Sequence, residues 1–170
     1  MAELTMLSTG LLRSSCVVVD EGHDVGRIEP STWPGRARVV VGRDEFELRR
    51  DRPWGGSYRL RRGGADGPEV ARADGSAFKR RFVVTLEPSR GDGPDVSCEL
   101  NGSRMMARWS VDVDGQPVGT IRPLSGTRLR GRASLPDELG PVGQLFCCAL
   151  VVVTVGRSGL PRGSDQDITP

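Results

Sequence analysis

The residues in this chain that could perform chemistry are few and widely scattered. The sequence contains one histidine, His23, and four cysteines, of which only Cys147 and Cys148 are neighbours. A nucleophilic or zinc site needs a base or several soft ligands at close spacing, and the chain has neither a CxxC pair nor a second histidine. We therefore expect His23 to be an exposed turn residue. We expect the cysteines, Cys16 and Cys98 included, to be buried and reduced.

Two other stretches carry part of a known binding pattern. Asp112-Val113-Asp114-Gly115 begins like a calcium loop, but Pro123 stands where the closing glutamate is required. The stretch 63–67 is rich in glycine like a phosphate-binding loop, but it lacks the lysine and the helix that follow in such loops. We interpret both stretches as hairpin turns. The sequence therefore predicts no catalytic residue, no metal site and no cofactor.

Arginine supplies nearly all of the positive charge, and several arginines are closely spaced. Arg59 and Arg61 lie on one expected strand, and Arg128, Arg130 and Arg132 occupy alternate positions of another, so each set shares a strand face. Alternate residues on a strand are about 7 Å apart, and each guanidinium can make a bidentate contact with a phosphate. These five arginines are the candidate site for an anion or a lipid headgroup. The alternative is ordinary solvated surface charge.

Composition favours a single domain rich in β-structure. The chain has 170 residues, and its 23 glycines and 12 prolines are spread along it, which is typical of many turns. A formal net charge of +2 is too small to predict nucleic-acid binding. Residues 1–12 lack the basic start and long apolar centre of a secretory signal. We expect a cytoplasmic monomer.

A hairpin pattern occurs three times in the sequence. The stretch 14–20 runs into the turn signal Asp20-Glu21-Gly22 and then into 25–30, which reads Val-Gly-Arg-Ile-Glu-Pro. The stretch 109–114 meets Gly115 and then 118–123, which reads Val-Gly-Thr-Ile-Arg-Pro. A weaker copy runs from 58–60 to 70–73 through Gly67. A short strand, a glycine turn and a second short strand predict antiparallel hairpins.

Alternation of apolar and polar residues predicts further strands around these hairpins. They lie near 4–7, 38–42, 45–50, 78–87, 95–100, 104–113 and 127–133, with a loop at 91–94. About a dozen short strands must curl or close to hide their edges. We therefore predict a closed antiparallel barrel.

The segment that would fill such a barrel lies near the end of the chain. From Leu145 onward no charged residue occurs before Arg157. We predict a helix over about 136–156, with Ser134 as its N-cap, Pro136 in its first turn and Gly156 as its stop. The β-branched run 151–155 weakly favours a strand instead, but length and cap signals favour the helix. A helix that is apolar all round needs apolar cover on every side. The predicted domain spans 1–157, followed by a disordered tail at 158–170.

The order and spacing of three of these units resemble those of the tubby C-terminal-like superfamily, which includes the LURP-one-related proteins and the phospholipid scramblases. The units are Tyr58-x-Leu60…Val70-Ala71-x-Ala73, Gly115-x-x-Val118-Gly119-x-Ile121, and Leu135-Pro136 leading into the apolar helix; together they cover roughly residues 14–157. The resemblance implies a twelve-stranded barrel wrapped around a buried C-terminal helix. The chain does not match the phosphoinositide-binding residues of the tubby proteins. It also lacks the Pro-rich N-terminal region and cysteine cluster of the scramblases.

Three functions remain open at this point. The first is a non-enzymatic binding or scaffold protein of the LURP-one-related type at a membrane surface, with anionic phospholipid or an acidic protein as its partner. The second is a scramblase-like lipid protein anchored by 142–155, although that stretch reaches only about 21 Å of a hydrocarbon core of roughly 30 Å. The third is a small enzyme with an unrecognised site, which the shortage of histidine disfavours.

Overall fold

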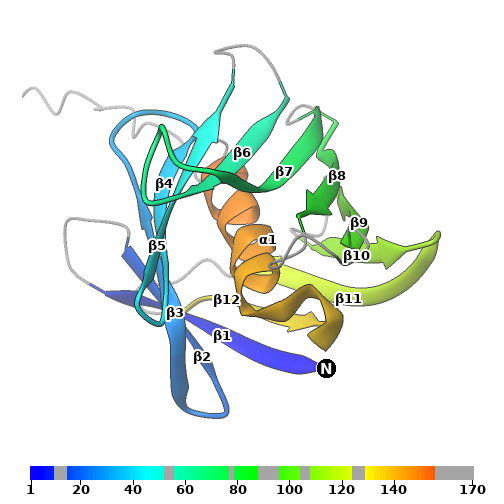
Figure 1. Ribbon diagram of the computed structural model, residues 1–170. Coiled ribbons are helices and arrows are strands. Elements are labelled where there is room, and N and C mark those ends of the chain that lie inside the picture. Colours follow the sequence, from blue (N-terminus) through cyan, green and yellow to red (C-terminus); the bar gives the residue numbers. More distant parts are fainter. Residues whose placement is uncertain are drawn as a thin grey trace, which may run out of the picture.

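The computed structural model describes residues 1–9, 15–51, 56–76, 79–87, 96–103, 108–123 and 129–155, the side chains of Leu129 and Arg130 excepted. These residues form twelve strands, one 3₁₀ turn and one helix (Figure 1). The elements are β1 Ala2–Thr9, β2 Ser15–Asp20, β3 His23–Pro30, β4 Arg36–Val41, β5 Asp44–Arg50, β6 Tyr58–Arg62, β7 Glu69–Ser76, β8 Arg81–Leu86, β9 Val96–Gly102, β10 Trp109–Val113, β11 Gln116–Pro123, β12 Leu129–Leu135, η1 Asp137–Leu139 and α1 Gly140–Val155.

The strands form one closed antiparallel barrel. Each strand pairs with its neighbours in the chain, and β1 closes the barrel by pairing with β12. Alternate residues of the wall face inward: Phe46 and Leu48 of β5 are buried, whereas Glu45 and Arg49 are exposed. Closure leaves no unpaired edge among the twelve described strands. The predicted fold class is therefore confirmed. The expected strand at 4–7 is longer than the sequence suggested and supplies the closing contact.

The helix α1 fills the interior of this barrel (orange in Figure 1). All residues from Gly143 to Val151 are buried, and Val153 is buried as well. The β-branched end of the segment stays helical because every strand around it already has both neighbours. The hydroxyl of Thr154 donates to the carbonyl oxygen of Leu150 at 2.7 Å, so this polar group is satisfied within the helix. The expectation of an enclosed apolar helix is confirmed.

Two glycines allow close approaches that no side chain would permit. A Cβ atom at Gly26 of β3 would lie 2.2 Å from the carbonyl oxygen of Val40 and 2.5 Å from the Cδ2 atom of Leu145 in α1. Gly119 occupies the matching place in β11, where a Cβ atom would lie 2.5 Å from the carbonyl oxygen of Ser134. The glycine of the shared Val-Gly-x-Ile-x-Pro pattern therefore marks a position where the neighbouring strand packs directly against the backbone. At Gly26 the helix packs there as well.

The three hairpins predicted from the sequence are also alike in detail. In two of them both turn residues have positive φ: 47° and 85° at Glu21 and Gly22, 50° and 75° at Asp114 and Gly115. Such turns match the twist of paired strands. Each hairpin also has a register shift at the same place, which leaves one unpaired valine on its second strand: Val25, Val118 and Val70. The repeat encodes a bulged hairpin.

Several predicted boundaries need correction. Ser134 is not a helix cap; it belongs to β12, and its hydroxyl donates to the carboxylate of Glu3 on β1. The backbone at Pro136 is extended, with φ −65° and ψ 142°, so the strand pairing ends there and α1 begins only at Gly140. β8 begins at Arg81 and β10 at Trp109, each later than expected. The expected loop at 91–94, the stop at Gly156 and the tail at 158–170 lie outside the described residues.

Candidate binding surface

His23 and the two partial binding motifs lie in three different hairpins. His23 is exposed at the start of β3, opposite Asp20, as the sequence predicted. The calcium-like stretch ends β10 and forms its turn, and the stretch 63–67 lies in the β6–β7 turn. Among the described residues, no three His, Cys, Asp or Glu side chains come together as metal ligands.

The four cysteines are free and buried. Cys98 of β9 and Cys147 of α1 contact each other; this contact lowers the pKa of Cys98 and, together with burial, raises that of Cys147. Burial raises the pKa of Cys148 to about 12. A thiol that stays protonated and enclosed is a poor nucleophile. The thiols on α1 are therefore packing groups, in agreement with the sequence interpretation.

Cationic side chains gather at one end of the barrel. Because the strands alternate in direction, the loops after β3, β5, β7, β9 and β11 all lie at the same end, where the odd-numbered strands finish. We call this the basic end. Its cationic residues are Arg36, Arg49, Arg50, Lys79, Arg80, Arg81, Arg108, Arg122 and Arg132. The acidic residues Glu29, Asp51 and Asp74 lie nearby, and Glu99 forms an ion pair with Arg81 at 2.8 Å; together they offset only part of this charge.

Strand register places some of these arginines directly opposite each other. Arg36 of β4 lies opposite Arg49 of β5, and Arg122 of β11 lies opposite Arg132 of β12. Like charges in directly opposed positions destabilise a sheet. None of these four side chains has an ion-pair partner within the described part of the chain. Their charge is therefore available to a ligand.

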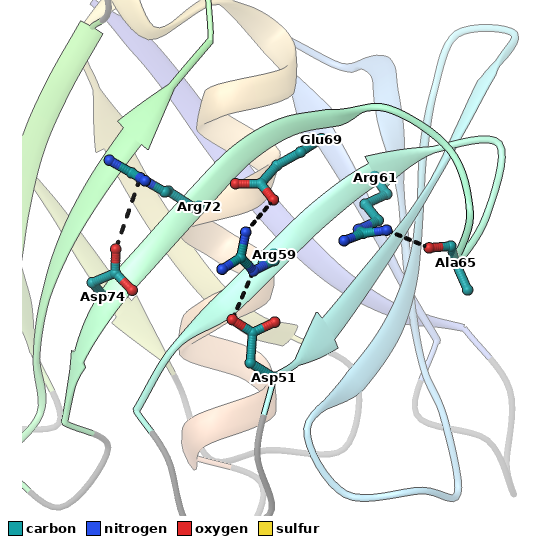
Figure 2. A network of polar contacts seen from close by, with 7 residues as sticks. All are labelled: Asp51, Arg59, Arg61, Ala65, Glu69, Arg72 and Asp74. Atoms are coloured by element: carbon teal, nitrogen blue, oxygen red, sulfur yellow. Dashed lines mark hydrogen bonds and ion pairs between the residues drawn. The ribbon is translucent and has the colours of Figure 1, made fainter.

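The arginines singled out on β6 are engaged within the protein. Figure 2 shows Arg59 between two carboxylates: its Nε donates to Asp51 at 2.7 Å and its Nη1 to Glu69 at 2.6 Å. These contacts raise the pKa of Arg59. Arg61 donates to the carbonyl oxygen of Ala65 at 2.7 Å. Arg59 is thus largely neutralised, and Arg61 contributes to the β6–β7 turn.

The described part of the second predicted set lies on β12, across the barrel from β6. Arg132 is exposed on β12; Arg130 belongs to β12, but its side chain lies outside the described residues, as does all of Arg128. Five strands separate β6 from β12 in either direction around the wall. Arg59 and Arg61 therefore lie on a different side of the barrel from Arg130 and Arg132. Arg59 and Arg132 do lie near the same end, and the sequence pattern did not indicate the arginines that accompany them there: Arg36, Arg49, Arg108 and Arg122.

An aromatic side chain projects from the basic end. Trp33, in the loop between β3 and β4, is 68% exposed, close in the chain to Arg36. Trp109, in contrast, is buried in the barrel wall and stacks on Phe82 with ring centroids 6.2 Å apart. Trp54 lies outside the described residues.

The opposite end of the barrel has the opposite sign. Its exposed carboxylates come from the turns after the even-numbered strands and from η1: Glu21, Asp24, Asp44, Glu45, Asp66, Glu87, Asp114, Asp137 and Glu138. We call this the acidic end. Within the described part of the chain, its cations are Arg43, Arg61, Arg62 and the amino group of Met1, which pairs with Asp137. Among the described residues, positive charge is therefore in excess at one end of the barrel and negative charge at the other.

The segment Asp137–Val155 is long and apolar enough to cross a membrane, with a mean hydropathy of 1.8. Length and composition alone do not distinguish a membrane span from the core helix of a barrel. Here the strands cover the segment, and its side chains form the centre of the hydrophobic core. Insertion into a bilayer would require the barrel to give up that core.

We compared the chain with family models, with curated proteins and with solved structures, and none of the three comparisons found a match.

Proposed function

We propose that this protein is a non-enzymatic, tubby-like barrel of the LURP-one-related type that binds anionic phospholipid through its basic end. The supporting observation is the two opposed arginine pairs there, Arg36–Arg49 and Arg122–Arg132, none of which has an ion-pair partner among the described residues. A surface that places like charges opposite each other loses stability on its own. It recovers that loss when phosphates lie between the guanidinium groups.

The shape and composition of the basic end favour a membrane surface over an acidic protein partner. Each Arg or Lys near an anionic bilayer contributes about 1 kcal/mol, so several free arginines at one end of a barrel give useful, reversible association. Trp33 adds a side chain of the kind that concentrates at the membrane–water interface. The acidic end would be repelled by the same bilayer. The protein would therefore bind in one orientation, at the cytoplasmic face and without inserting α1.

A flotation assay with neutral and phosphatidylserine-containing vesicles tests this proposal. We expect binding to the anionic vesicles only, weakened as the Debye length falls from about 10 Å at 0.1 M salt to about 3 Å at 1 M. The variant Arg36→Gln/Arg49→Gln/Arg122→Gln/Arg132→Gln should lose the binding.

The matched comparison is between Arg36→Gln/Arg49→Gln and the control Arg27→Gln/Arg43→Gln, each of which removes two charges. The control should bind as the unmodified protein does, and Arg36→Gln/Arg49→Gln should bind more weakly. An equal loss of vesicle binding in both variants would show that net charge, and not the position of the arginines, determines binding. Absence of binding at low salt would refute the proposal.

A further inference from the structure

A cavity opens at the acidic end, between the first turn of α1 and the adjacent strand ends. Its volume is about 460 Å³. The apolar part of its lining includes Val70, Leu86, Val96 and Val142, which come from β7, β8, β9 and α1. Three of them are half-buried, so apolar surface is accessible within the cavity. The cavity can take an apolar side chain.

Carboxylates line the rim of the same cavity. Glu87 and Glu138 are exposed there, and neither has an ion-pair partner within the described residues. Glu69 also lines the cavity, but its charge is matched by Arg59. The lining also contains a cation, Arg62, whose guanidinium lies 5.6 Å from the ring centroid of Phe46. After these contacts the rim keeps a net negative charge.

The surrounding surface adds a carboxylate beyond the cavity. Asp66 lies in the β6–β7 turn, whereas Asp137, beside Glu138 in η1, is ion-paired with the amino group of Met1. A partner that enters the cavity therefore meets apolar contacts at the centre and carboxylates around it. Central apolar burial with a charged rim is the usual organisation of a protein–protein contact.

From this arrangement we propose that the acidic end binds a segment of another protein in which an apolar side chain is flanked by Lys or Arg. The apolar side chain occupies the cavity, and the flanking cations pair with Glu87 and Glu138. An anionic ligand does not suit this rim, and neither does an anionic bilayer. The proposal does not depend on membrane binding at the basic end, which lies at the other end of the barrel.

Fluorescence anisotropy with a short labelled peptide of alternating Leu and Lys tests the proposal. We expect saturable binding that is weaker in high salt. A peptide with Ser in place of Leu should bind more weakly because it leaves the cavity empty. A peptide with Glu in place of Lys should not bind. Equal binding of the Leu and Ser peptides would overturn the role of the cavity.

Two variants locate the binding on the protein. Glu87→Gln/Glu138→Gln should weaken it about tenfold, since exposed ion pairs contribute up to about 1 kcal/mol each. Val142→Trp should block the cavity. The matched control, Glu21→Gln/Asp114→Asn, removes the same charge from the same end but outside the cavity, and it should leave affinity within about twofold.

Melting curves show whether each variant is folded. If Val142→Trp is unstable, Glu87→Gln/Glu138→Gln still tests the site. If Glu21→Gln/Asp114→Asn weakens peptide binding equally, the overall charge of this end determines affinity, and the proposal is overturned. Self-association in analytical ultracentrifugation that Glu87→Gln/Glu138→Gln abolishes, with no peptide bound, would overturn it in favour of a second copy of this chain. Vesicle flotation of Glu87→Gln/Glu138→Gln should be unchanged, so failure here is distinguishable from failure at the basic end.

Discussion

Two adjacent valines of α1 provide a direct test of the enclosed helix. Val151 is fully buried against the barrel, whereas its neighbour Val152 is half-buried. Replacing either by alanine removes two methylene equivalents and changes helix propensity by the same amount. The two substitutions therefore differ only in the surroundings of the side chain.

The expected magnitudes follow from burial. At Val151 the lost transfer free energy is about 1.6 kcal/mol, to which an unfilled cavity adds. The better helix propensity of alanine offsets at most about 0.7 kcal/mol of this, so the free energy of unfolding should fall by about 1–2.5 kcal/mol. At Val152 about half of the transfer term applies, and the propensity gain nearly cancels it. We expect Val151→Ala to unfold about 2–10 °C below Val152→Ala.

Urea unfolding followed by tryptophan fluorescence, with thermal melts in parallel, measures both variants. The comparison is meaningful only if both variants give the same slope of free energy against urea concentration. If the two losses agree within about 0.5 kcal/mol, the barrel does not enclose α1 on the side of Val151. The account of the core would then be refuted.

Two further outcomes follow from the core. Gly26→Ala should lower the free energy of unfolding by more than about 2 kcal/mol, because its Cβ would meet the backbone carbonyl of Val40. Urea unfolding measures this loss. An unchanged free energy of unfolding would contradict the close packing of β3 on β4. The free energy of unfolding should also fall between about pH 8.5 and about 12, because the unfolded chain ionises Cys148 in that range while burial keeps the folded thiol protonated. The contribution is complete below about pH 8.5 and declines by up to about 1.4 kcal/mol per pH unit. Cys148→Ala should reduce that slope, and an unchanged slope would show that the thiol does not cause it.

Local chemistry in the sequence predicts much of this fold. The turn glycines Gly22 and Gly115 mark their hairpins because few other residues adopt positive φ. Alternation assigns Phe46 and Leu48 to the inner face because side chains on a strand alternate between faces. The uncharged run from Leu145 predicts a covered helix because such a run has no face to expose to water. In each case a few neighbouring residues carry the whole signal.

Pairing between distant segments accounts for what the sequence did not predict. Ser134 looks like a helix cap in its local context, but pairing with Glu3, which is far away in the chain, keeps it in a strand. Arg59 looks like a free cation until the fold brings Asp51 and Glu69 to it.

The separation of charge has the same origin. Alternating strand direction collects one sign of charge at each end from turns that are widely separated in the sequence, and register places Arg36 opposite Arg49 and Arg122 opposite Arg132. Turns, alternation and the apolar helix are properties of short stretches, and the sequence by itself determined them. The two charged ends are sums over the whole barrel, and only the tertiary structure decided them, because Coulomb interactions depend on distance in space and not along the chain.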